Sequence, residues 1–532
     1  MTFDFIIVGG GSAGCVTAGR LAGEFGARVL LLEEGGDDRN LLIRMPAGLV
    51  KLMVPGSRYY TKHLSVPQRE LGGRRIPVLQ AKVLGGGSAL NAMAYMRGTR
   101  ADYDRWDDAL GGTGWAWNDL LPYFKRQEAN QRLGEPFHGT AGPLKVSDPH
   151  HPISNISRSF LLAMQEKGIL FTSDFNSGET MGAGILQSTT FRGERWSAAR
   201  AFLAPVQGHP NLVVKLNAKV IRILFDGTRA VGVEFGDAGG GSTAMVHAGA
   251  VILTAGCFAS AQLLMLSGIG HADRLRSHGL DVTADLPGVG QGFQDHHDVR
   301  VAFETTANFG YSREDRGFAM VRNGLQYILF KSGPAASTGS EVTAFINPGD
   351  CGAEPTVQYY CAGRLPTAHD AEARYGVALV ANLIAPRSRG TIELRSSNPR
   401  DLPLIDPNWF SERADLDHLV AGVERLFDFV NAAPMRDKIR RSLRLAPGAS
   451  RAEIAAFARA VTSTNWHPVG SCRMGREDDR HAVVDTNLRV LGTQNLYVFD
   501  GSIMPTIIGA NTNAPIMAIA DKGVDLVMGV RH

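Results

Sequence analysis

The hydrophobic positions near the start of the chain predict three successive elements. Residues 5–8 and 28–32 are short apolar runs, and residues 12–23 between them are predicted to form a helix. A strand, a glycine turn, a helix and a second strand in this order predict a βαβ unit. Such a unit implies a parallel sheet with a right-handed crossover.

Later segments show other patterns. Residues 211–224 and 230–253 alternate between apolar and polar side chains, which predicts antiparallel strands. The glycine run 239–242 predicts a hairpin loop, and residues 251–256 predict a buried strand that ends in a turn. Residues 413–431 and 450–460 are predicted helices, and the chain closes with a strand at 496–499 and a helix from about Ala514. Pro515 suits the first turn of that helix because its missing N–H has no partner there.

Composition excludes several classes of protein. The 532 residues are 44% hydrophobic and 20% charged, with a formal charge of +3, which indicates neither a nucleic-acid nor a membrane surface. Five dispersed cysteines lack metal-ligand spacing and favour a reducing compartment. No apolar stretch reaches the roughly 18 residues that span a bilayer, and no basic leader precedes the first apolar run. We therefore expect a cytoplasmic protein without a transmembrane segment or a metal site.

A glycine motif follows the first predicted strand and reads Gly9-x-Gly11-x-x-Gly14. Gly9 permits a tight turn, Gly11 lets the backbone approach a pyrophosphate, and Gly14 lets the helix pack on the strand. The free N–H groups of the helix N-terminus favour an anion. An acidic residue that binds ribose is expected about 20 residues further on, where Glu33 stands. We predict dinucleotide binding by Gly9, Gly11, Ser12, Ala13, Gly14 and Glu33; the motif alone does not separate FAD from NAD.

Two further segments carry candidate chemistry. Residues 81–95 contain a second glycine run, which by itself is a flexible turn as readily as a ligand contact, but beside the first motif predicts backbone pressed against a flat ring system. Asn465-Trp466-His467-Pro468 stands 44 residues before Asn511-Thr512-Asn513. A lone histidine is more often structural than catalytic, but Pro468 favours extended geometry at His467 and therefore a fixed, projecting side chain.

With these segments together, the chain resembles the glucose–methanol–choline (GMC) flavin oxidoreductases over nearly its whole length. The resemblance rests on residues 81–104, 256–270, 286–296, 467–475 and 499–505, with departures at Cys257 and Ala261. Bacterial choline, aliphatic-alcohol and sorbose dehydrogenases look most similar. The resemblance implies an α/β (α+β composite) fold, in which a Rossmann-like FAD-binding domain carries a substrate domain built on an antiparallel sheet. We assign residues 1–150, 195–300 and 461–532 to the FAD-binding domain, and residues 151–194 and 301–460 to the substrate domain.

The family resemblance also implies roles for individual residues. His467 would be the base that faces flavin N5, and Asn511 its partner. Val220 would touch the adenine, and Leu90 stands where some members attach flavin covalently through a histidine. FAD should therefore be bound non-covalently. The remaining residues expected at the cofactor are Gly86, Ser88, Asn91, Ala92, Met93, Ala94, Trp466, Asp500 and Thr512.

The expected reaction is the oxidation of an alcohol to an aldehyde or ketone by hydride transfer to flavin N5. A histidine of near-neutral pKa suits removal of the hydroxyl proton, and Asn511 can hydrogen-bond the substrate oxygen. We favour a dehydrogenase with a quinone or dye-like acceptor over an oxidase that uses oxygen. A hydroxynitrile lyase, a nicotinamide dehydrogenase and a non-catalytic flavin protein stay open as alternatives. The particular alcohol, the oligomeric state and peripheral association with a membrane are not decided by the sequence.

Overall fold

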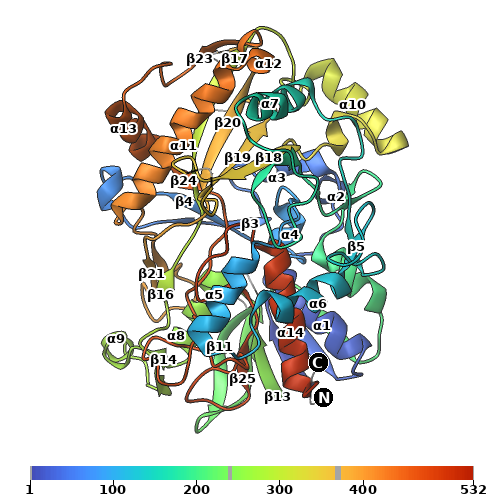
Figure 1. Ribbon diagram of the computed structural model, residues 1–532. Helices are drawn as coiled ribbons and strands as arrows, with labels where there is room; N and C mark the ends of the chain where they lie inside the picture. The colour runs from blue at the N-terminus through green and yellow to red at the C-terminus, as the bar shows by residue number, and fades with distance from the viewer. Residues whose placement is uncertain (1–2, 238–242, 351, 366–372, 531–532) are drawn as a thin grey trace.

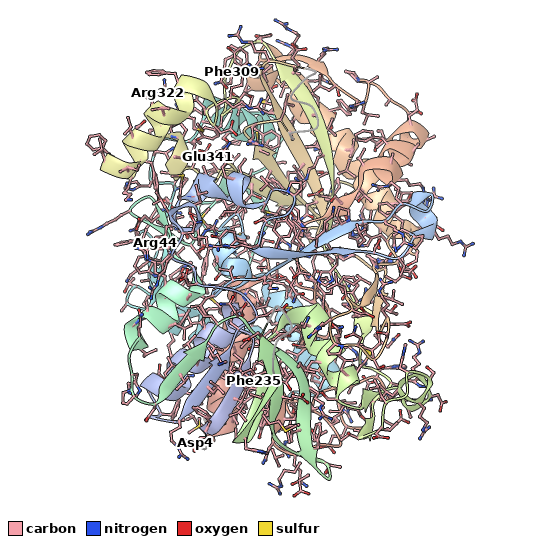
Figure 2. All side chains as sticks on the ribbon, turned by 180° about the vertical axis from the view of Figure 1, so that it is seen from behind. Asp4, Arg44, Phe235, Phe309, Arg322 and Glu341 are labelled. Atoms are coloured by element: carbon pink, nitrogen blue, oxygen red, sulfur yellow. The ribbon has the colours of Figure 1, made fainter. Side chains whose placement is uncertain are left out.

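Two seven-stranded sheets occupy opposite ends of the molecule in the computed structural model (Figure 1). The structure describes residues 3–237, 243–350, 352–365 and 373–530. β3 (Tyr60–Leu64) and β4 (Pro77–Ala81) form an antiparallel pair that lies between the two ends of the molecule. Figure 2 shows the same division from behind, with Asp4 and Phe235 at one end and Phe309 and Arg322 at the other.

The first sheet is built around the predicted βαβ unit. β1 (Phe3–Val8) pairs in parallel with β2 (Val29–Leu32), and α1 (Ser12–Gly23) connects them. All four side chains of β2 are buried, as expected for a strand covered on both faces. The strand order is β10-β2-β1-β13-β12-β11, with β25 added beside β13. The other strands are β10 (Leu212–Lys215), β11 (Ala218–Asp226), β12 (Arg229–Asp237), β13 (Thr243–Leu253) and β25 (Leu496–Val498).

One strand prediction is wrong within this sheet. β11, β12 and the first part of β13 are antiparallel as expected, but β10 pairs in parallel with β2. Alternation of apolar and polar residues indicates which side chains of a strand are exposed. It does not indicate whether a partner strand about 180 residues away runs parallel or antiparallel to it. The predicted hairpin loop at 239–242 lies outside the described residues.

Helices from both ends of the chain cover the first sheet. α14 (Asn513–Met528) lies against α1 and α6 (Trp117–Gln127). α5 (Arg100–Leu110) packs against α6, and α8 (Gly256–Leu266) packs against β11. The buried guanidinium of Arg20 on α1 donates to Asp521 at 2.7 Å and to Asp525 at 2.8 Å on α14. These buried charges are paired, which fixes the C-terminal helix beside the glycine motif.

The second sheet is antiparallel and has two different faces. Its order is β23-β17-β20-β19-β18-β7, with β24 added beside β17. Alternate side chains such as Val299, Val301 and Phe303 pack into a core with α7 (Asn155–Glu166), α11 (Arg413–Asn431) and α13 (Arg451–Val461). Side chains on the opposite face are therefore free to form a site. The strands are β7 (Gly182–Ile185), β17 (His297–Thr305), β18 (Val342–Ile346), β19 (Val357–Ala362), β20 (Gly376–Leu383), β23 (Ile439–Ser442) and β24 (Ser463–Thr464).

Smaller elements complete the described chain. A three-stranded sheet joins β16 (Gln291–Phe293), β21 (Gly390–Glu393) and β22 (Leu404–Asp406). Short pairs are formed by β5 (Glu128–Asn130) with β6 (Leu144–Val146), β8 (Thr190–Phe191) with β9 (Glu194–Arg195), and β14 (Ile269–Gly270) with β15 (Ala284–Asp285). The other α-helices are α2 (Leu41–Arg44), α3 (Leu49–Leu52), α4 (Gly87–Leu90), α9 (Ala272–Ser277), α10 (Gly317–Phe330) and α12 (Ala433–Arg436). Within the described ranges, the helices are all too short or too polar to cross a membrane.

Candidate active site

The three glycines of the first motif have different surroundings. A Cβ at Gly9 (φ +104°) would lie 2.7 Å from the backbone oxygen of Thr254, and one at Gly14 would lie 1.9 Å from the backbone oxygen of Gly9. A Cβ at Gly11 would meet nothing closer than the Thr254 oxygen at 3.8 Å. The protein thus fills the space beside Gly9 and Gly14 and leaves the space beside Gly11 open, at the N-terminus of α1.

The second glycine turn lies directly against the first. The N–H of Gly85 donates to the Gly10 carbonyl at 2.7 Å, and a Cβ at Gly86 (φ +52°) would lie 2.6 Å from the Cα of Gly11. Ser88 Oγ donates to the Gly85 carbonyl at 2.6 Å and accepts from the Ala198 N–H at 2.9 Å. Two segments separated by about 75 residues therefore form one continuous backbone cradle.

Glu33 directly follows β2 and lies beside this cradle. Its carboxylate accepts the N–H groups of Gly10 and Gly35, each at 2.7 Å. Burial nevertheless raises the pKa of Glu33 to about 7. Val220 lies nearby on β11, because the Ala218 N–H at the start of that strand donates to the Glu33 carbonyl at 2.8 Å. The structure thus places the start of β11, the strand that carries Val220, beside Glu33.

The residues after α4 are held by an arginine that sequence analysis did not single out. The Asn91 side-chain oxygen accepts from the Met93 N–H at 3.0 Å and from Arg195 Nη1 at 2.8 Å. Met93 has a left-handed backbone (φ +63°), which this turn stabilises. Ala92 is exposed and Ala94 forms an isolated bridge with Ser188.

His467 and Asn511 meet although 44 residues separate them. Asn511 Nδ2 lies 3.2 Å from His467 Nε2, and His467 Nδ1 lies 3.0 Å from His296 Nδ1. His296 Nε2 lies 3.2 Å from the Ile384 carbonyl, which can only accept a hydrogen bond. His296 is therefore protonated on Nε2 and accepts at Nδ1, so that His467 must donate from Nδ1. The lone pair of His467 is left on Nε2, beside Asn511.

Both histidines are neutral in this arrangement. Burial lowers the pKa of His467 to about 4, and burial together with the adjacent His467 holds the pKa of His296 well below its usual range. The Asn511 side-chain oxygen is buried and has no hydrogen-bond partner among the described residues. The pair thus presents one basic nitrogen, one amide donor and one unfilled acceptor.

The backbone of His467 is anchored by Asp295. One oxygen of this carboxylate accepts the His467 N–H at 2.8 Å, and the other contacts the Thr464 hydroxyl. Burial raises the pKa of Asp295 to about 7. Trp466 has a left-handed backbone (φ +59°) and is 39% exposed, so it is not part of the core.

The last two predicted cofactor residues, Asp500 and Thr512, lie at the N-terminal ends of two different helices. Asp500 accepts from the Gly256 N–H at 2.8 Å and from the Ser260 hydroxyl at 2.6 Å, which binds its carboxylate to the start of α8. Thr512 is buried at the N-terminal end of α14, and the next residue, Asn513, accepts from the Ser12 hydroxyl at 2.7 Å. This last contact connects the C-terminal segment that carries Asn511 to the first glycine motif.

Sequence analysis assigned no role to four of these supporting residues. The Asp295-His296 pair was noted only as part of a family segment, and nothing in its local pattern indicated contact with His467. Arg195 has no local signal either. Asn513 stood beside the candidate Asn511, but its bond to Ser12 joins residues 501 positions apart.

The comparisons identify the class of protein. Family models described as GMC oxidoreductase match residues 3–298 and 386–520. The chain belongs to the GMC oxidoreductases, and it is an FAD-dependent oxidoreductase that acts on CH–OH groups.

Individual relatives match over nearly the full length. An alcohol dehydrogenase (acceptor) of Pseudomonas putida is 38% identical over 99% of this chain and 96% of that protein. The mitochondrial choline dehydrogenase of Homo sapiens is also 38% identical, over 99% and 90%. Among solved structures, a pyridoxine 4-oxidase from Mesorbium loti gives a TM-score of 0.89 at 29% identity over 100% of both chains. An FAD-dependent oxidoreductase from Chaetomium thermophilum gives 0.91 at 26% identity, covering 99% of each chain.

Proposed function

We propose that the protein is a dehydrogenase that oxidises an alcohol with His467 as the base and passes the electrons to a quinone or dye-like acceptor. The observation that carries the proposal is the contact of His467 Nε2 with the Asn511 amide at 3.2 Å. The relatives named alcohol dehydrogenase (acceptor) and mitochondrial choline dehydrogenase favour a non-oxygen acceptor. Oxygen is the alternative acceptor, since other relatives are named oxygen-dependent choline dehydrogenase.

The glycine cradle fits the cofactor. The open space beside Gly11 would receive the pyrophosphate, where N–H groups of α1 point outward and the first helical turn carries no acidic residue. Glu33 would hold the ribose and Val220 the adenine, while residues 86–94 would contact the ring system. FAD, when bound, supplies a hydride acceptor at N5. These assignments rest on the described contacts and on the family.

The residues of this chain would handle the proton. His467 Nε2 accepts the substrate hydroxyl proton, because its Nδ1 is already committed to His296. Asn511 Nδ2 then donates to the oxygen that becomes more negative, and so stabilises the alkoxide character that develops. Asp295 fixes the backbone of the base, and His296 fixes its tautomer.

We propose that the chain folds into two domains with the boundaries that the sequence predicts. Residues 1–150, 195–300 and 461–532 would bind FAD, and residues 151–194 and 301–460 would cover the substrate. Most strands of the antiparallel sheet lie in the second set, while β17 begins at His297 and β24 spans Ser463–Thr464. The base would therefore stand where the two domains meet.

The test of the reaction is an anaerobic panel of alcohols. An oxidisable alcohol should bleach the flavin absorbance, and reoxidation by a quinone or dye should outpace reoxidation by oxygen. Faster reoxidation by oxygen, with hydrogen peroxide formed, would identify an oxidase. A panel that includes cyanohydrins and produces cyanide without bleaching would indicate a hydroxynitrile lyase.

We expect the flavin to be bound without a covalent link. Leu90, at the position of the linking histidine in some relatives, is a buried hydrocarbon side chain that cannot form the bond. Acid precipitation should release all the yellow colour into the supernatant. Colour retained by the washed pellet would contradict the expectation.

The exposed apolar helix α10 is relevant to where in the cell the protein is found. α10 turns seven large apolar side chains to the outside, with Phe318 82% exposed, and only Asn323 and Tyr327 are buried. Two cations of ion pairs, Arg322 on α10 and Lys331 directly after it, are more exposed than their acidic partners. The Arg322 side chain is 56% exposed and that of Glu314 is 23% exposed. The Lys331 side chain is 36% exposed and that of Glu194 is 18% exposed. The other apolar side chains are Met320, Val321, Leu325, Ile328, Leu329 and Phe330. We propose a cytoplasmic protein whose α10 rests on an anionic lipid surface.

Vesicle sedimentation tests this location. The protein should sediment with phosphatidylglycerol-containing vesicles more than with phosphatidylcholine vesicles, and Leu329→Glu should abolish sedimentation. Met245→Glu, at a comparably exposed position on β13 at the other end of the molecule, should have no effect. Equal sedimentation of both variants would contradict the proposal.

A further inference from the structure

One face of the antiparallel sheet is polar where it meets the base. Along β17, His297, Val299 and Val301 point toward the helix side, where His297 stacks on Trp409. Because side chains alternate along a strand, His296, Asp298 and Arg300 share the opposite face. His296 contacts His467 directly, so Asp298 and Arg300 lie on the side of the sheet that carries the base.

The charges on this face neutralise one another. Arg300 donates from Nε to both Asp298 oxygens at 3.1 Å and from Nη2 to Oδ2 at 2.8 Å. The Tyr360 hydroxyl lies 3.2 Å from Asp298 Oδ2 and 3.2 Å from Asn465 Oδ1, two residues before the base. The Asp298 side chain is 1% exposed and the Arg300 side chain 37% exposed. On this face the Arg300 cation is therefore accessible, while the Asp298 carboxylate is covered.

Arg300 also covers the aromatic surface beside the base. Its guanidinium carbon lies 5.8 Å from the centre of the Trp466 ring, within the distance of a cation–π contact. A quaternary ammonium group is recognised by a free aromatic face or by an unpaired carboxylate. Here one face of the Trp466 ring has its own cation, and the Asp298 carboxylate is already paired.

We propose that Arg300 determines the charge preference of the site and selects alcohols without a positive charge over quaternary ammonium alcohols. This proposal rests on the proposed function, because it concerns the pocket of the same base. It assigns Arg300 a role in specificity, without participation in the transfer of the proton or hydride.

The test compares two probes of equal shape. Choline and 3,3-dimethylbutan-1-ol differ in one central atom and therefore in one positive charge. We expect the uncharged alcohol to be favoured at least about tenfold, since like charges placed side by side are strongly unfavourable. The measured quantity is the ratio of second-order rate constants for anaerobic flavin reduction. If neither probe is oxidised, the ratio of their inhibition constants against the best alcohol of the panel replaces it.

Three variants locate the cause of this preference. Arg300→Gln leaves the Asp298 carboxylate without its cation and should shift the ratio toward choline by at least about tenfold. The double variant Asp298→Asn with Arg300→Gln removes both charges, avoids an unpaired buried carboxylate, and should bring the ratio close to one. Arg440→Gln, an exposed arginine on β23 that pairs with Glu304 on the same strand as Arg300, should keep the wild-type ratio.

The outcomes separate this proposal from the function on which it rests. Equal or greater preference for choline in the wild type, or one ratio shared by all variants, would overturn the role of Arg300 while alcohol oxidation stands. If every alcohol of the panel fails to bleach the flavin, the proposed function is refuted, and the charge preference falls with it.

Discussion

Replacement of His467 by alanine should slow flavin reduction by roughly 10²–10⁴-fold, because the alcohol then loses its proton acceptor. The rate should be measured by anaerobic stopped flow at saturating alcohol. FAD content should stay normal, because His467 is not part of the cradle at Gly9–Gly14 and contacts His296, Asn511 and Asp295 instead. Near wild-type reduction would refute the assignment.

The same base predicts a pH dependence. With a pKa of about 4, His467 is neutral at neutral pH and becomes protonated as the pH falls. The reduction rate should therefore be level above about pH 5 and decline below it, as Nε2 loses its lone pair to a proton. A decline toward higher pH would contradict the role of the neutral imidazole.

Asn511 provides the matched second position. Asn511→Ala removes one donor to the reacting oxygen and should cost roughly 10²–10³-fold. The double variant should be much less impaired than the product of the two single effects, because residues that act as a unit are non-additive. Full additivity would leave both residues in the site but deny that they act on the same oxygen.

Replacement of Gly11 by valine should give a colourless protein. Gly11 has φ −76°, a value that any residue adopts, and the protein leaves the space beside its Cα open. A valine there is therefore tolerated by the fold but occupies the position of the pyrophosphate. The measurement is the ratio of flavin to protein absorbance after purification, with circular dichroism to establish folding.

A matched control separates cofactor loss from misfolding. Gly324 on α10 also has open space around its Cα, so Gly324→Val should purify yellow. Gly14→Ala, by contrast, places a Cβ 1.9 Å from the Gly9 oxygen and should impair folding itself. Normal flavin content in Gly11→Val would show that the dinucleotide site is elsewhere.

The sequence determined the parts of this protein that depend on local pattern. The βαβ unit and its glycine spacing extend over only 30 residues, where the periods of a buried strand and a helix differ clearly. The predicted helices at 413–431 and 450–460 correspond to α11 and α13. The GMC oxidoreductase family and its fold were also predicted from motifs and are confirmed.

Only the tertiary structure decided which distant groups meet. β10 is parallel because it pairs with β2, and alternation along β10 contains no information about that partner. The tautomer of His467 depends on His296 and the Ile384 carbonyl, and Arg300 contacts both Asp298 and Trp466. Hydrogen bonds and charges act over a few ångströms in space whatever the separation in sequence, so a single sequence names these residues but does not pair them.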